Sequence, residues 1–222
     1  MQFDQWWLPA GEQHLPDWMR KVNKRVDGRL TYQYHKYEAA LKCVPVNRRG
    51  VAVDIGGHVG LWSWFMARDF AKLAAFEPMD EHAACWRRNM DGIAHAKLHQ
   101  CALGDHDGGV RLLTRTQGSS GDTGVELGGA GGQPAMLRRL DDFDLGVVDF
   151  IKIDCEGYEV FVLKGAAETI KRSKPVIIVE QKTETGGPDR YGIGATDGVM
   201  FLKALGMRSL HPPISGDWIM GW

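Results

Sequence analysis

The sequence places several charged side chains close together in one short segment. Lys152, Asp154 and Glu156 are two residues apart and alternate with apolar residues in the run DFIKIDCEG. This spacing puts them on one face of a β-strand, where buried charges are costly unless they are paired or functional. Glu180 ends a second apolar run, VIIVE. Since a carboxylate beside a hydroxyl group can accept its proton, Asp154 is our first candidate general base, followed by Glu180 and Glu156.

Two other interpretations of these charges stay open. Lys152 could form an internal salt bridge with a neighbouring carboxylate. Alternatively, Asp154, Glu156 and Glu180 could hold a divalent cation, and carboxylate oxygens suit Mg²⁺ better than Zn²⁺. The histidine spacing does not strengthen a metal site, because His95 and His99 are four apart but flank a predicted strand. We therefore expect no metal, with Mg²⁺ as the alternative.

A glycine-rich turn follows the apolar run VAVDI. It contains Asp54, Gly56, Gly57, His58 and Gly60. Glycine lets the backbone turn sharply and approach a ligand closely, and the start of the helix beyond it favours a negative group. The spacing does not fit the G-x-G-x-x-G of dinucleotide sites, but it fits the D/E-x-G-x-x-x-G used for S-adenosylmethionine. The alternative is a tight structural turn.

Glu77 ends the next apolar run, in the sequence FEP. A carboxylate at the carboxyl end of a strand can accept hydrogen bonds from both ribose hydroxyls of an adenosine cofactor. This feature does not separate a methyl donor from NAD. The alternative is a solvent-exposed strand end.

Alternating strands and helices must position these residues. From Gly50 onward the predicted strands are the runs VAVDI, AKLAAFEP, AKLHQCAL, DFIKIDCEG and KPVIIVEQ. Apolar strands that alternate with helices indicate a parallel sheet covered on both faces. Asp80 is the expected N-cap of the helix DEHAACWRRNM. MRSLH and DWIMGW predict an antiparallel hairpin, so we expect a doubly wound, mostly parallel, Rossmann-like α/β fold with a C-terminal antiparallel hairpin.

Two segments lie outside this alternation. Residues 1–47 are expected to form an N-terminal extension for substrate or oligomer contacts, with a helix near Asp17–Val26, and residues 48–222 a class I methyltransferase domain. Between Gln117 and Gln133 the stretch GSSGDTGVELGGAGG has too few apolar residues to pack a core. It is either a surface loop between two strands or a mobile lid over the site.

Composition restricts the partners. The 222 residues are 44% hydrophobic and 25% charged, with a formal net charge of -1, which argues against a surface built for nucleic acid or anionic membrane. No apolar run approaches the ~20 residues of a membrane-spanning helix. The widely spaced cysteines favour reduced thiols in a cytoplasmic protein. We expect no nucleic-acid or membrane partner and leave a homodimer open.

Several segments, in this order, carry a resemblance to a known family: VDIGGHVGLWS, FEP, CALGD, LRRLDDF, DFIKIDCEGYEVFVLKGA and PVIIVEQ. Over roughly Gly50–Gln181 the sequence resembles the FkbM family of S-adenosylmethionine-dependent methyltransferases. The most specific element is Asp149–Gly165, together with Leu140–Asp142. The resemblance implies S-adenosyl-L-methionine as cofactor and S-adenosyl-L-homocysteine (SAH) as product. It also implies O-methylation of a sugar, a polyketide or a similar hydroxylated molecule.

The resemblance implies roles for individual residues. It assigns the methionine-side loop to Asp54, Gly56, Gly57 and Gly60, the ribose to Glu77, the adenine to Ala102, Leu103 and Asp105, and the reacting methyl group to Asp154. His58, inside the same loop, is a further candidate for cofactor binding. The chain departs from the family pattern at Gly57-His58, where the family usually has Ala-Asn, and at Cys155, where it usually has Val.

Two other functions remain as alternatives. An NAD-dependent oxidoreductase is disfavoured by the glycine spacing and the terminal hairpin. A non-catalytic binding module of the same fold is disfavoured because the glycine loop, Glu77 and Asp154 are all intact. We expect an enzyme that acts on a small-molecule or glycan acceptor.

Overall fold

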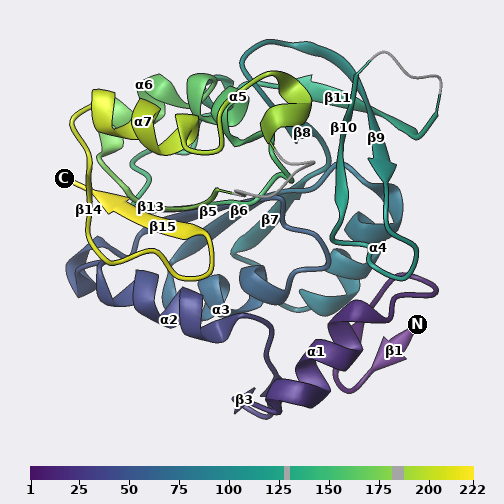
Figure 1. Ribbon diagram of the computed structural model, residues 1–222. Coiled ribbons are helices and arrows are strands. Elements are labelled where there is room, and N and C mark those ends of the chain that lie inside the picture. The colour runs from purple at the N-terminus through teal and green to yellow at the C-terminus, as the bar shows by residue number, and fades with distance from the viewer. Residues whose placement is uncertain (128–130, 182–187) are drawn as a thin grey trace.

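The computed structural model describes residues 1–127, 131–181 and 188–222. Its main sheet contains β5 (Val51–Ile55), β6 (Lys72–Phe76), β7 (Ala96–His99), β12 (Phe150–Ile153), β13 (Val176–Glu180), β14 (Arg208–Ser209) and β15 (Asp217–Gly221). Their order in the sheet is β14-β15-β13-β12-β5-β6-β7 (Figure 1). Neighbouring strands are parallel from β13 to β7, whereas β15 is antiparallel to β13 and β14. The mostly parallel sheet and its terminal hairpin are therefore confirmed.

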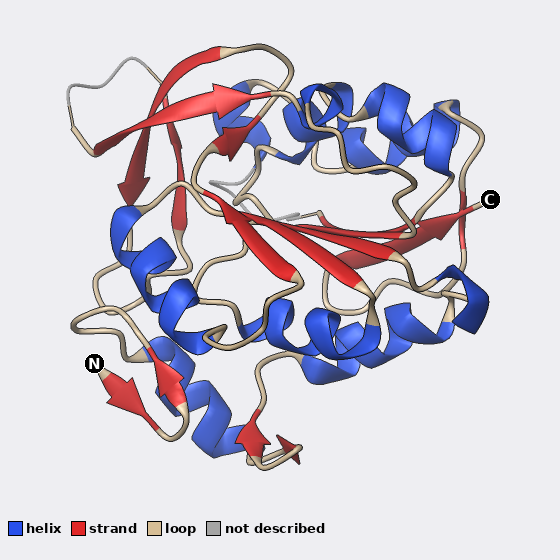
Figure 2. Cartoon of the chain, turned by 180° about the vertical axis from the view of Figure 1, so that it is seen from behind, coloured by secondary structure: helices blue, strands red, loops and turns tan. Residues whose placement is uncertain are grey.

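Helices cover both faces of this sheet, as Figures 1 and 2 show. One face carries α5 (Glu159–Lys164), α6 (Ala167–Ser173) and α7 (Asp197–Ala204), and the other carries α2 (Tyr34–Lys42), α3 (Leu61–Asp69) and α4 (Asp80–Asn89). Because strand side chains alternate, Ile151 and Ile153 enter the first core and Phe150 the second. Burial on both faces explains the continuous apolar runs of these strands. No helix in the described part of the chain is long and apolar enough to cross a membrane.

A second sheet lies beside the main one. It consists of β8 (Ala102–Leu103), β9 (Gly108–Thr114), β10 (Thr123–Glu126) and β11 (Gln133–Arg138), in the order β10-β9-β11-β8. The prediction of one strand over AKLHQCAL is therefore wrong, because β7 ends at His99 and the chain then enters the second sheet. Apolar residues lie on both sides of this break, since Ala96 and Leu98 pack against one hydrophobic core and Ala102 and Leu103 are buried in another.

Part of the glycine-rich stretch is a strand. Thr123–Glu126 forms β10 and pairs antiparallel with β9, and Val125 is buried. The surface-loop interpretation is therefore wrong for these four residues. Residues 128–130 of the stretch lie outside the described residues, and the lid interpretation stays a prediction.

The N-terminal segment packs against the glycine-loop side of the sheet. It contains β1 (Gln2–Phe3), β2 (Trp6–Trp7), α1 (His14–Val22), β3 (Arg25–Val26) and β4 (Arg29–Leu30). Leu15 and Met19 of α1 share a hydrophobic cluster with Val59 and Leu61. The helix begins and ends earlier than expected. It ends at Val22 because Asn23 adopts the left-handed conformation (φ 47°). The division of the chain at residue 47 stays a prediction.

Three short 3₁₀ helices complete the described elements: η1 (Val46–Arg48), η2 (Leu140–Asp142) and η3 (Pro188–Tyr191). The expected N-cap of α4 is wrong. Met79 occupies the cap position without a side-chain cap bond, and Asp80 is the first helical residue. The Asp80 carboxylate instead accepts a hydrogen bond from Gln100 Nε2 (2.6 Å).

Candidate active site

A cavity of about 300 Å³ opens where four parallel strands end. In open α/β sheets, ligands bind beyond the carboxyl ends of the strands. The N-terminal segment and the β9–β10 hairpin supply further parts of its wall, as do α3, α4 and β8. The predicted site residues that line the cavity are Gly56, Gly57, His58, Glu77, Ala102, Leu103, Asp154, Glu156 and Glu180.

The glycine loop brings three strand ends together. Gly56 has φ +74°, and a Cβ there would lie 2.0 Å from the Asp154 carbonyl oxygen, so only glycine fits. The N–H groups of Gly56 and Gly57 both donate to the Phe76 carbonyl (3.0 Å each). Gly60, also at positive φ (+91°), immediately precedes α3. The backbone of the loop thus links β5, β6 and the residue after β12.

Asp54 lies beneath the cavity and is fully buried. Its Oδ2 accepts a hydrogen bond from Ser63 Oγ (2.5 Å), and its Oδ1 is 3.5 Å from Lys152 Nζ. Lys152 Nζ also donates to the Gly56 carbonyl (2.7 Å) and lies 3.7 Å from Asp154 Oδ2. Burial opposes the charge of this ammonium group, but the Asp154 and Asp54 carboxylates raise the pKa of Lys152 above its ordinary value. The internal salt bridge of Lys152 is therefore confirmed.

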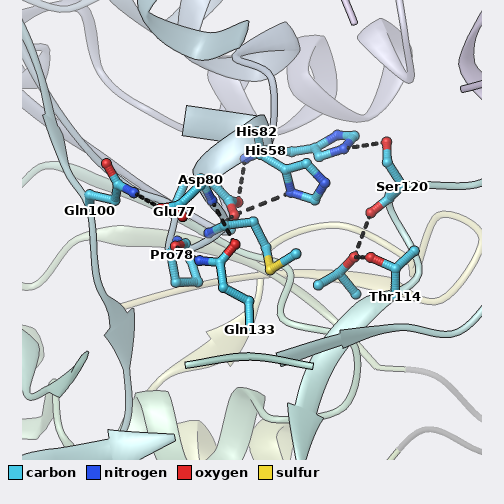
Figure 3. A network of polar contacts seen from close by, with 12 residues as sticks. His58, Glu77, Pro78, Asp80, His82, Gln100, Thr114, Ser120 and Gln133 are labelled. Atoms are coloured by element: carbon cyan, nitrogen blue, oxygen red, sulfur yellow. Dashed lines mark hydrogen bonds and ion pairs between the residues drawn. The ribbon is translucent and has the colours of Figure 1, made fainter. Parts of the chain in front are cut away.

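Glu77 is buried at the end of β6 and is held by its surroundings (Figure 3). Its Oε2 accepts a hydrogen bond from the His58 N–H (2.9 Å). Its Oε1 accepts one from the Met79 N–H (2.9 Å) and lies 3.3 Å from His82 Nδ1. An ionised carboxylate has about four acceptor positions. These contacts within the described residues therefore leave about one for a ligand.

His58 connects the glycine loop to the β9–β10 hairpin. It has a left-handed backbone (φ 48°), and its Nε2 lies 2.8 Å from Ser120 Oγ (Figure 3). Its ring also packs edge-on against His82, with 4.4 Å between ring centroids. Burial, together with His82, holds the pKa of His58 well below its ordinary value, so the imidazole is neutral near pH 7.

Three carboxylates lie close together in the wall of the cavity. Asp154, Glu156 and Glu180 each offer an oxygen, and these oxygens lie within 4.8 Å of one another. Asp154 and Glu156 follow β12, and Glu180 ends β13. The fold therefore brings together carboxylates from two strand ends. The oxygens could hold a divalent cation such as Mg²⁺, but acidic groups cluster without one as well, and we assign no ion to them.

A buried glutamate supports this cluster. Glu159 Oε1 accepts hydrogen bonds from the N–H groups of Cys155 (2.9 Å) and Gly157 (3.1 Å). Between these residues Glu156 takes a left-handed backbone (φ 55°). Glu159 thus holds the turn that presents Glu156 beside Asp154.

One predicted residue lies apart from the others. Asp105 is near the surface, where its Oδ1 is 2.7 Å from His106 Nδ1, and it is not among the described residues that line the cavity. Asp54 and Gly60 are likewise not among the described residues that line the cavity.

The chain is similar to known proteins in sequence and in fold. Residues 54–206 match the family described as the methyltransferase FkbM domain. The chain belongs to this family. The resemblance found in the sequence is thereby confirmed. The FkbM match includes the glycine loop, Glu77 and the three clustered carboxylates, but not the N-terminal segment.

Two curated proteins are similar to this FkbM chain. One is Methyltransferase 1 of Beauveria bassiana (strain ARSEF 2860), 26% identical over 141 residues, which cover 51% of this chain and 57% of that protein. The other is Methyltransferase sdnD of Sordaria araneosa, 30% identical over 157 residues, which cover 52% and 60%. The chain thus spans less than two thirds of the length of these relatives.

Solved structures share the fold. Methyltransferase FkbM from Methylobacillus flagellatus KT is similar over 79% of this chain and 44% of that chain, at 17% identity and a TM-score of 0.50. A Streptococcus mutans protein in complex with SAH is similar over 86% and 97%, at 11% identity and a TM-score of 0.51. At these identities the likeness establishes the fold alone.

Several residues of this FkbM site escaped sequence reasoning. Tyr32 lines the cavity, and burial together with the Asp154 and Glu180 carboxylates raises its pKa, so its hydroxyl stays protonated. Ser120 was visible only as part of a glycine-rich stretch. Glu12 is buried, although nothing in its local sequence distinguishes it from a surface glutamate.

Proposed function

We propose that this FkbM chain transfers a methyl group from S-adenosylmethionine to a hydroxyl group of a sugar or another small hydroxylated metabolite. The observation that carries the proposal is the convergence of the glycine loop, Glu77 and Asp154 on one cavity at the strand ends. Membership of the FkbM family supports methyl transfer. The SAH in the similar Streptococcus mutans structure supports the cofactor.

The residues around the cavity fit this cofactor. Gly56 and Gly57 let a ligand approach the backbone closely. Glu77 has about one acceptor position left for a ribose hydroxyl, and Ala102 and Leu103 offer apolar surface to an adenine ring. When bound, S-adenosylmethionine supplies an electrophilic methyl group.

Asp154 is the proposed general base. Its side chain is 33% exposed, lines the cavity and lies 3.7 Å from Lys152 Nζ. An alcohol is a weak nucleophile, so a carboxylate that accepts its proton as the new bond forms accelerates transfer. Glu180 and Glu156 are the next candidates, and they can also hydrogen-bond neighbouring hydroxyls of the acceptor. If the acceptor is a neutral amine, Asp154 only orients it.

The N-terminal segment is the proposed source of acceptor contacts. His14, Leu15, Tyr32 and Gln33 line the cavity, and all of them precede the region that matches the FkbM family. These side chains offer both aromatic and hydrogen-bonding surface to a ligand. Acceptor choice is therefore proposed to depend on residues 1–47.

The cellular setting is proposed from the thiols. Cys43, Cys85, Cys101 and Cys155 are all free cysteines. Unpaired thiols suit a reducing compartment. We therefore propose a cytoplasmic enzyme whose partner is a small-molecule or glycan acceptor.

Isothermal titration with S-adenosylmethionine, SAH and NAD tests the cofactor. We expect micromolar binding of the first two, no binding of NAD, and loss of affinity in Glu77→Ala. Asp91→Ala, which removes an exposed carboxylate, is the matched control and is expected to bind like the wild type.

The alternatives predict different titrations. Binding of NAD alone would support an oxidoreductase, and binding of none of the three ligands would support a non-catalytic module. The acceptor is then sought by transfer of radiolabelled methyl groups to a panel of hydroxylated and amine compounds. Label on amines but not on hydroxyls contradicts O-methylation.

A further inference from the structure

A buried carboxylate from the N-terminal segment reaches the wall of the cavity. Glu12 is 3% exposed, and its Oε1 accepts the N–H of Leu15 (2.9 Å) near the start of α1. Its Oε2 accepts both the N–H (2.6 Å) and the hydroxyl of Ser120. The N–H groups of Gln13 and His14 donate to the Gly118 carbonyl (2.9 and 3.0 Å). The N-terminal segment and the β9–β10 hairpin are thus tied together beside the cavity.

The hydrogen bonds around Ser120 determine where the proton of His58 lies. A serine hydroxyl has one proton, and here it donates to the Glu12 carboxylate. The Ser120 oxygen can therefore only accept from His58 Nε2 at 2.8 Å, which requires the proton on Nε2. In a neutral imidazole, Nδ1 is then a hydrogen-bond acceptor.

His58 lies on the cavity wall and in the glycine loop, and its own N–H donates to Glu77. The chain of contacts therefore runs from Glu12 through Ser120 and His58 to Glu77. It links a segment outside the FkbM match to the residues proposed to bind the cofactor.

We propose that Glu12 and Ser120 are positioning residues for the cofactor: they hold His58 in the tautomer whose Nδ1 accepts a hydrogen bond from an N–H or O–H donor of S-adenosylmethionine. This inference rests on the proposed function. The donor is either the ammonium group at the amino-acid end or a ribose hydroxyl, which offer the same chemistry.

The test measures the binding of SAH and of 5′-methylthioadenosine, which lacks the amino-acid end, by isothermal titration. Ser120→Ala and Glu12→Gln are each expected to weaken SAH binding roughly three- to tenfold, the effect of one hydrogen bond. Thr116→Ala removes an exposed hydroxyl on the same hairpin, bonded only to Asp122 among the described residues, and is expected to bind like the wild type. Weaker binding of SAH alone identifies the amino-acid end, and weaker binding of both ligands identifies the ribose.

Two results would overturn the inference. One is unchanged SAH affinity in folded Ser120→Ala and Glu12→Gln. The other comes from long-range ¹H–¹⁵N NMR of histidine-labelled wild-type protein, if His58 carries its proton on Nδ1 rather than on Nε2. Failure of the wild type to bind SAH at all is a separate result, because it removes the proposed function as well.

Discussion

The buried carboxylate of Glu159 makes the stability of this chain depend on pH in a defined direction. Its side chain is nearly inaccessible, and burial raises its pKa from 4.5 to about 7, although the N–H groups of Cys155 and Gly157 oppose the change. In the unfolded chain the ordinary value applies. As pH rises between these two values, the unfolded state releases the proton of Glu159 while the folded state keeps it, so the free energy of unfolding falls.

The size of the change in the free energy of unfolding follows from the difference between the two pKa values. Each pH unit between them is worth about 1.4 kcal/mol, which gives about 3 kcal/mol across the interval. Glu159→Gln removes the titration and keeps an oxygen for both N–H groups. We expect this variant to match the wild type at about pH 4.5 and to be more stable by about 3 kcal/mol at about pH 8.

Urea unfolding of both proteins at several pH values measures this difference. Asp217, whose pKa burial raises to about 6, titrates in the same interval. It does so in both proteins, so the difference between them isolates Glu159. Glu168→Gln, in which the lost carboxylate is 71% exposed, is the control and is expected to show no such trend. A stability difference between the wild type and Glu159→Gln that does not change with pH would refute the reasoning.

Three further predictions concern the site and its support. Asp154→Asn is expected to lower kcat by about 10²–10⁴-fold while SAH affinity stays within a few fold, because it removes the proposed proton acceptor and keeps the size of the side chain; steady-state kinetics with the identified acceptor check this, and an unchanged kcat contradicts it. Gly56→Ala is expected to prevent folding or SAH binding, since its Cβ would lie 2.0 Å from a carbonyl oxygen, whereas Gly109→Ala meets open space and should behave like the wild type in circular dichroism and titration. In the wild type the ammonium group of Lys36 lies 3.0 Å from the buried Asp217 carboxylate. Lys36→Met removes this cation and leaves Asp217 without it. The expected cost is about 3–5 kcal/mol and a melting temperature roughly 10 °C lower, and a double variant that adds Asp217→Asn should recover much of it.

Much of the fold was predictable because it follows from local patterns. Continuous apolar runs identified β5, β6, β12 and β13, since a strand that is buried on both faces has mostly apolar side chains on each face. The clustering of Asp154 with Glu180 was also within reach, because the carboxyl ends of parallel strands meet at one edge of a sheet.

Other local patterns were misleading. The run that contains β7 and β8 has apolar residues on both sides of His99 and Gln100, where the chain changes sheets, because both parts pack against a core. Asp80 has the residue type of an N-cap, yet it begins the helix and bonds to Gln100. A residue type limits what a side chain can do, but its neighbours decide what it does.

The sequence by itself determined the class of this protein: a parallel α/β sheet, a glycine loop that requires its glycines, and acidic residues at the strand ends. Only the tertiary structure decided which charges are structural and which face the cavity. Asp54 is fully buried and pairs with Lys152, while Glu12 meets Ser120 across 108 positions of chain. Such choices depend on desolvation and on partners brought from distant segments, and neither leaves a trace in the residues adjacent in sequence.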